Sequence, residues 1–145
     1  MNFDDYNKKA INDAYKNAHI AMQSISDILP QVKDEKMKKE LNKEFNGYKK
    51  IIKKISTFMA QQKVQPEDVN VFKKMMLKAS VKTKSIFNDS LNNIAEMMIK
   101  GTVLGITELT AMVNEKNNLS EEVSALIEEL LALEETYEQD LKKFL

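Results

Sequence analysis

The stretch IAEMMIKGTVLGITELTAM, residues 94–112, decides how this chain must fold. Read as a helix, it places one apolar stripe along a single face, and further apolar residues leave little of the circumference polar. The stripe consists of Leu91, Ala95, Met98, Thr102, Gly105, Leu109 and Met112. A helix that is apolar on most sides is normally covered on most sides, so we expect this one inside a helical bundle.

Two glycines interrupt this helix. Gly101 and Gly105 lie four residues apart, on or near the apolar stripe. Each costs a helix about 1 kcal/mol relative to alanine, so something must need the missing side chain. The pattern predicts either the close approach of a neighbouring helix or a space for a small apolar ligand, lined by Gly101, Gly105 and Met98.

The composition favours long helices in one domain, residues 1–145. Two prolines and three glycines are too few to punctuate many short strands. The absence of cysteine excludes disulfides, thiolate metal sites and cysteine nucleophiles. The polar N-terminus lacks a signal sequence, and nowhere do eighteen uncharged apolar residues run together. We therefore expect a cytoplasmic protein that does not contact a membrane.

The charges cancel overall but are unevenly distributed. The formal net charge is zero, and all 22 basic residues are lysine. Lysines crowd residues 33–84, whereas acidic residues crowd residues 121–140. Without arginine, the chain lacks the planar donor that reads guanine or phosphate, and no ladder of aromatic residues accompanies the lysines. We expect no nucleic-acid binding.

Apolar spacing along the whole chain predicts helices over residues 3–29, 34–62, 67–83, 86–115 and 120–144. The short links at 30–33 and 116–119 make the first two and the last two of these helices antiparallel neighbours. Pro66 opens the third helix, which at 1.5 Å per residue covers about 25 Å and crosses the bundle from end to end. The predicted fold is all-α: a four-helix bundle of two antiparallel hairpins joined by a helical crossover.

Carboxylates interrupt two of the apolar stripes. Glu44 lies within the second helix's stripe and Glu134 within the last helix's stripe, so both are expected to point inward. If the crossover resets the chain direction, the two carboxylates come out at similar heights, and His19, the only histidine, falls at that height on the first helix. The supporting polar groups nearby are Tyr48, Tyr137 and Thr102.

A buried carboxylate must be neutralised, and the sequence leaves several means open. His19 can act as a protonated counter-ion, the tyrosine hydroxyls can donate hydrogen bonds, or one metal ion can be held by His19, Glu44 and Glu134. A histidine and two carboxylates suit iron, zinc and manganese equally. The simplest alternative is a set of polar contacts that fixes the register of the helices.

Paired hairpins, a long crossover and mid-bundle carboxylates resemble the ferritin-like superfamily, which includes rubrerythrin-type and bacterioferritin-type proteins. The di-iron site of that family uses a glutamate from each of two helices and a Glu-x-x-His motif from each of the other two. Here EFNG (residues 44–47) and EETY (residues 134–137) stand where the two motifs would be. His19 and Thr102 stand near the positions of the family's two lone glutamates. Because Gly47 and Tyr137 replace the motif histidines, the resemblance implies a degenerate site without di-iron catalysis.

We therefore predict a non-catalytic ferritin-like bundle with a structural or protein-interaction role and a vestigial polar site. The partner is expected to be a second copy or a partner helix, bound through apolar residues that the stripe does not use, such as Met97, Val103 and Leu104. Two alternatives stay open. One is a single-metal-binding protein or degenerate metalloenzyme, and the other is a carrier of a small apolar ligand.

Overall fold

The structure, a computed structural model, describes residues 4–67 and 90–145. Within these ranges the chain is helical and has no strand, which confirms the predicted all-α class. The helices are α1 (Asp5–Ile28), α2 (Glu35–Gln61), α4 (Leu91–Asn114) and α5 (Glu121–Lys142), with short 3-10 turns η1 (Leu29–Gln31) and η2 (Lys116–Asn118). The crossover helix predicted over residues 67–83 lies, apart from its first residue, outside the described residues.

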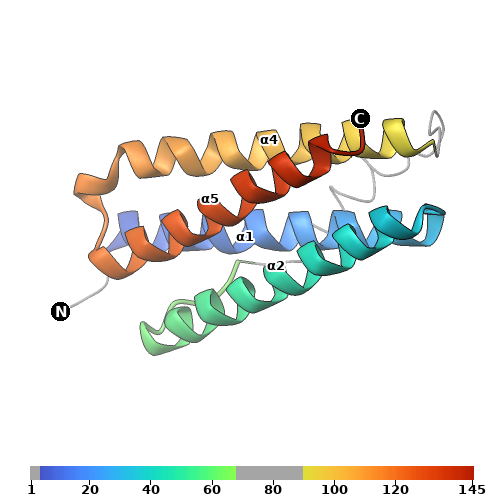
Figure 1. Cartoon of the computed structure of the whole chain (residues 1–145). Helices are drawn as coiled ribbons and strands as arrows, with labels where there is room; N and C mark the ends of the chain where they lie inside the picture. Colours follow the sequence, from blue (N-terminus) through green and yellow to red (C-terminus); the bar gives the residue numbers. More distant parts are fainter. Residues whose placement is uncertain (1–3, 68–89) are drawn as a thin grey trace.

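The helices pack side by side (Figure 1). α1 and α2 are antiparallel, α4 and α5 are antiparallel, and α2 and α4 run in the same direction. α1 contacts the other three helices, and α5 contacts both α2 and α4. None of the helices in the described part of the chain is long and apolar enough to cross a membrane.

Each helix begins at a residue whose side chain caps it. The oxygens of Asp4, Asp34, Ser90 and Ser120 accept hydrogen bonds from backbone N–H groups in the first turns of α1, α2, α4 and α5. These groups have no partner inside the helix, so the cap satisfies them. Three helices begin within two residues of the predicted positions. α4 begins at Leu91 and not at residue 86, because Ser90 caps it there.

The apolar spacing of α2 predicts a stripe of Met37, Leu41, Phe45, Tyr48, Ile52, Ile55 and Met59, with Glu44 interrupting it and also pointing inward. The burial of Glu44 is confirmed and Ile51 is buried as well, whereas Phe45 and Ile52 are half-buried. Both patterns satisfy helical periodicity, because residues one position apart lie 100° apart on the helix and the core face is about that wide. The consequence is that Glu44 lies at the centre of the buried face.

α4 is less covered than its composition predicts. Ile94, Ala95, Met98 and Leu109 are buried, but Leu104 is 74% exposed, and Leu91 and Val103 are also exposed. Among the described elements, α4 packs mainly against α5 and α1. The prediction that α4 is covered on most sides is therefore wrong for these residues, and one flank of the helix faces outward.

Three buried asparagines of α1 connect it to other parts of the chain. The side-chain oxygen of Asn7 accepts a hydrogen bond of 2.8 Å from the backbone N–H of Ser120. The side-chain oxygen of Asn12 accepts one of 3.0 Å from the N–H of Glu67. The amide of Asn17 donates one of 3.1 Å to the carbonyl oxygen of Gly105. α1 is thereby fixed to the start of α5, to the residues after α2 and to α4.

We expect Asn7→Ala to lower the free energy of unfolding by about 1–2 kcal/mol, because the N–H of Ser120 loses its acceptor. Urea denaturation followed by circular dichroism measures this loss. Asn42→Ala is the matched control, because Asn42 is exposed and its side chain donates a hydrogen bond to the Lys38 carbonyl of its own helix. Equal losses in both variants would contradict the role assigned to Asn7.

Candidate functional site

Four polar side chains from α2 and α5 meet inside the bundle. Glu44 and Glu134 are each 1% exposed, Tyr48 is 2% exposed and Tyr137 is 4% exposed. The two tyrosine rings pack edge to face, with 5.4 Å between their centroids. We call Glu44, Tyr48, Glu134 and Tyr137 the polar layer. All four residues are among those that the sequence singles out.

The two carboxylates of the polar layer lie at different heights. Ion pairs join Lys43 to Asp140 at 2.9 Å and Lys54 to Glu129 at 2.7 Å. The separation between Lys43 and Lys54 along α2 equals the separation between Glu129 and Asp140 along α5. Both ion pairs therefore fit one register of these antiparallel helices. In that register Glu134 lies about five residues further along α2 than Glu44, or about 7.5 Å at 1.5 Å per residue. The predicted common height is therefore not observed.

Glu44 faces another carboxyl group, that of Glu40 one turn earlier on α2. Burial, a hydrogen bond with Glu40 and the negative charge of Glu40 together raise the pKa of Glu44 to about 10, against the opposing charge of Lys43. Within the described chain, Oε2 of Glu44 and Oε2 of Glu40 have no hydrogen-bond donor. A proton on Glu44 supplies the donor that this pair lacks, so the raised pKa favours the neutral form of Glu44 at pH 7.

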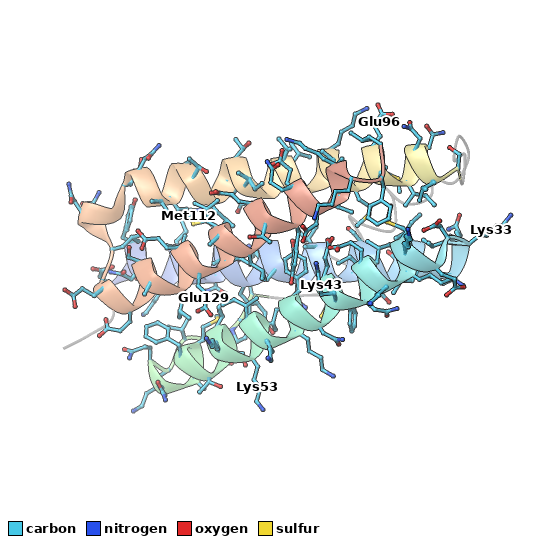
Figure 2. All side chains as sticks on the ribbon, in the orientation of Figure 1. Lys33, Lys43, Lys53, Glu96, Met112 and Glu129 are labelled. Atoms are coloured by element: carbon cyan, nitrogen blue, oxygen red, sulfur yellow. The ribbon has the colours of Figure 1, made fainter. Side chains whose placement is uncertain are left out.

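Lys43 projects from α2 toward α5 (Figure 2) and reaches Asp140 and the ring of Tyr137. Its ammonium group pairs with Glu40 at 2.8 Å and with Asp140 at 2.9 Å, and it lies 6.0 Å from the ring centroid of Tyr137. The two hydrogen bonds raise the pKa of Lys43 and lower that of Asp140. The lysine therefore stays charged and holds α2 and α5 together above the buried groups.

Glu134 is neutralised in a different way. Burial and the charge of Glu108 on α4 together raise its pKa to about 8, against the lowering effect of the Tyr48 hydroxyl. Neither carboxylate oxygen of Glu134 accepts a well-formed hydrogen bond from the described residues. Tyr48 also responds, because its own pKa is raised by burial and by the charges of Glu134 and Glu44. Glu134 is thus mostly protonated at pH 7.

Two glycines make room for the polar layer. At Gly105 of α4 a Cβ atom would overlap Oε1 of Glu134 and lie 3.3 Å from its Cδ, so the close helix approach predicted there is confirmed. At Gly47 of α2 a Cβ would overlap the hydroxyl of Tyr137 and lie 3.1 Å from Cζ. The sequence analysis names Gly47 only because it replaces a histidine of the family motif. A glycine on the inner side of a helix is a signal that could have predicted the close contact with Tyr137.

Gly101 behaves differently from the other two glycines. It is exposed, and none of the described residues lies within 4 Å of the position that its Cβ would occupy. No helix of the described chain therefore accounts for it. Met98 is buried in the core, and Thr102 donates a hydrogen bond of 2.7 Å to the Met98 carbonyl of its own helix, so neither belongs to the polar layer.

The tentative metal ligands do not come together. His19 is half-buried and packs against Tyr15, with 4.5 Å between the ring centroids. Among the residues that the structure describes, no three histidine, aspartate or glutamate side chains are grouped so that they could hold a metal ion. His19, Glu44 and Glu134 therefore form no ligand set for iron, zinc or manganese in this structure, because each carboxylate faces a different neighbour.

A groove of about 980 Å³ lies between α2 and α5. Its apolar lining comes from Ile51, Phe58, Leu126 and Leu133, and lysines and glutamates form its edges. Gly101, Gly105 and Met98 are not among the residues that line it. The groove is therefore distinct from the ligand space that the sequence predicts on α4.

The fold and the polar layer define a class, a helical bundle with buried, protonated carboxyl groups at its centre. Comparison with protein-family models, with curated proteins and with solved structures finds no match to this chain. The resemblance to the ferritin-like superfamily stays a prediction.

Proposed function

We propose that this protein is a non-catalytic helical bundle that acts by binding another protein. The observation that carries the proposal is the contrast between the polar layer and α4. The four groups of the polar layer are at most 4% exposed, whereas Leu104, in the middle of α4, is 74% exposed. Catalytic groups must come within hydrogen-bond reach of a substrate, which burial of this degree prevents.

The binding surface that we propose is one flank of α4, formed by Met97, Gly101 and Leu104 and called the α4 patch. Successive members are four and three residues apart, so they share one side of the helix. Met97 is half-buried, Gly101 is exposed and Leu104 protrudes. Apolar side chains on the outside of a rigid helix are typical of contact surfaces between proteins.

We also propose that the arrangement of helices is ferritin-like. Two observations support this. The chain forms two antiparallel hairpins, and α2 and α4 run in the same direction, which requires a connection long enough to return along the bundle (Figure 1). An experimental structure that shows a short connection, or an antiparallel α2 and α4, would rule this topology out.

The proposed function predicts a defined protein contact at position 104. A photo-crosslinking amino acid at this position, in cells that naturally make the protein, is expected to give an adduct of one discrete mass. The same amino acid at Ala132, exposed on α5, is the control and is expected to give none. The adduct should disappear when Gly101→Leu is added, because the new side chain covers the patch. Without an adduct specific to position 104, the proposed function is wrong.

A further inference from the structure

The starting point is the cost of Gly101 in the middle of α4. A glycine there destabilises the helix by about 1 kcal/mol relative to alanine. Gly47 and Gly105 each leave room for a buried side chain of the polar layer, but none of the described residues occupies the space beside Gly101. A neighbour that needs this space must therefore come from outside the described chain.

Leu104 supplies a matching projection beside this space. It lies three residues from Gly101 on the same flank, so the α4 patch carries both a hole and an exposed aliphatic side chain. A surface with these two features is complementary to itself. In a two-fold dimer every contact occurs twice, with residue i on residue j and residue j on residue i. Small residues at a crossing also let two helices approach closely.

We propose that the partner bound at the α4 patch is a second copy of this chain, with Leu104 of each copy packed over Gly101 of the other. This inference rests on the proposed function, because it names the partner of the same surface. A contact made by one helix from each copy is small, so the dimer is expected to be transient, with a dissociation constant in the micromolar range.

Charge complementarity selects the antiparallel arrangement of the two α4 helices. Lys100 and Glu108 lie on either side of the pair Gly101 and Leu104. An antiparallel crossing centred on that pair brings Lys100 of each copy within about one turn of Glu108 of the other. A parallel crossing would oppose lysine to lysine. Among the described residues, Lys100 forms an exposed ion pair of 3.2 Å with Glu96 on the outer side of α4 (Figure 2), and Glu108 accepts a long hydrogen bond of 3.4 Å from Asn17 of α1. Both contacts are weak, so exchanging them costs little.

The test is sedimentation equilibrium of the full chain over a wide range of concentration. The wild type is expected to dimerise. Gly101→Leu fills the hole and Leu104→Gly removes the projection, and each is expected to weaken dimerisation by at least roughly tenfold. The double variant Gly101→Leu with Leu104→Gly exchanges hole and projection, and is expected to restore it. Circular dichroism confirms that each variant is folded, and Leu104→Ala replaces Leu104→Gly if the latter unfolds.

Several results would overturn the dimer. One is a wild type that stays monomeric at every concentration, and another is dimerisation that neither single variant weakens. A monomer whose melting temperature falls with Gly101→Leu would point to residues 68–89 of the same chain as the occupant. A monomer that still gives a specific adduct at position 104 in cells would leave the proposed function standing and refute only the second copy.

Discussion

The Glu134→Gln variant is expected to be more stable than the wild type at pH 7, by on the order of 3 kcal/mol, and no more stable at pH 4.5. Glu134 is 1% exposed, and burial raises its pKa to about 8. In the unfolded chain the same carboxyl group titrates near its ordinary value of 4.5. Glutamine has nearly the same shape as protonated glutamate, and its side chain does not ionise in this pH range.

The direction of the pH dependence follows from which state holds the proton. Between pH 4.5 and about 8 the folded protein keeps the proton on Glu134, whereas the unfolded chain has released it. Raising the pH in this window therefore favours unfolding, by about 1.4 kcal/mol per pH unit for each such proton. Glu44 acts in the same direction up to its pKa of about 10. Asp140 acts in the opposite direction in acid, because its pKa is lowered by Lys43.

Guanidinium denaturation at pH 5, 6, 7 and 8 measures the effect. The difference between Glu134→Gln and the wild type should grow steadily across this series. Glu135→Gln is the matched control, because Glu135 is the adjacent residue on α5 but is exposed. If the stability of Glu134→Gln falls as steeply with pH as that of the wild type, Glu134 is ionised in the folded protein and the polar layer is not neutral.

The Gly47→Ala variant is expected to be less stable than the wild type by about 1–3 kcal/mol, although alanine is the better helix former. The new Cβ would overlap the hydroxyl of Tyr137, and Tyr137 is 4% exposed and packed against Tyr48, so the ring has little room to move. Thermal and urea denaturation measure the loss. Gly101→Ala is the matched control and is expected to gain up to about 1 kcal/mol, because its Cβ meets no described residue.

A double-mutant cycle identifies the cause of the loss. Tyr137→Phe removes the hydroxyl that the Cβ at position 47 would overlap. Gly47→Ala is therefore expected to cost less in the Tyr137→Phe background than in the wild type. Additive losses would mean that Gly47 is needed for another reason.

Local features of the fold could be predicted from the sequence. Helices α1, α2 and α5 begin and end within a few residues of their predicted limits, because caps such as Asp34 and Ser120 and the break at Pro30 act on their immediate neighbours. The register between helices could not be predicted in the same way. It depends on how whole side chains interlock, and it is the register marked by the ion pairs of Lys43 with Asp140 and of Lys54 with Glu129 that puts Glu44 and Glu134 at different heights.

The candidate site was predictable where it follows helical periodicity. The burial of Glu44, Tyr48, Glu134 and Tyr137 follows from their positions in apolar stripes. His19, which was predicted only from its height along α1, packs against Tyr15 and lies outside the polar layer.

The contacts of the three buried asparagines of α1 could not be predicted from the periodicity of the sequence. Asn7, Asn12 and Asn17 are five residues apart, a spacing that turns successive side chains by about 140° around the helix. Each therefore reaches a different neighbour, namely Ser120, Glu67 and Gly105. A search for residues that share one face of a helix cannot find them.

The raised pKa values of Glu44 and Glu134 bear on the net charge of the folded molecule. The formal balance of 22 lysines against 22 acidic residues counts every carboxyl group as ionised. If these two buried groups keep their protons, the native protein near pH 7 is expected to carry a small net positive charge and to have an isoelectric point above the sequence value of 6.6. The unfolded chain has no such excess of positive charge. Native electrophoresis, which separates molecules by net charge, is therefore expected to distinguish the folded from the unfolded state.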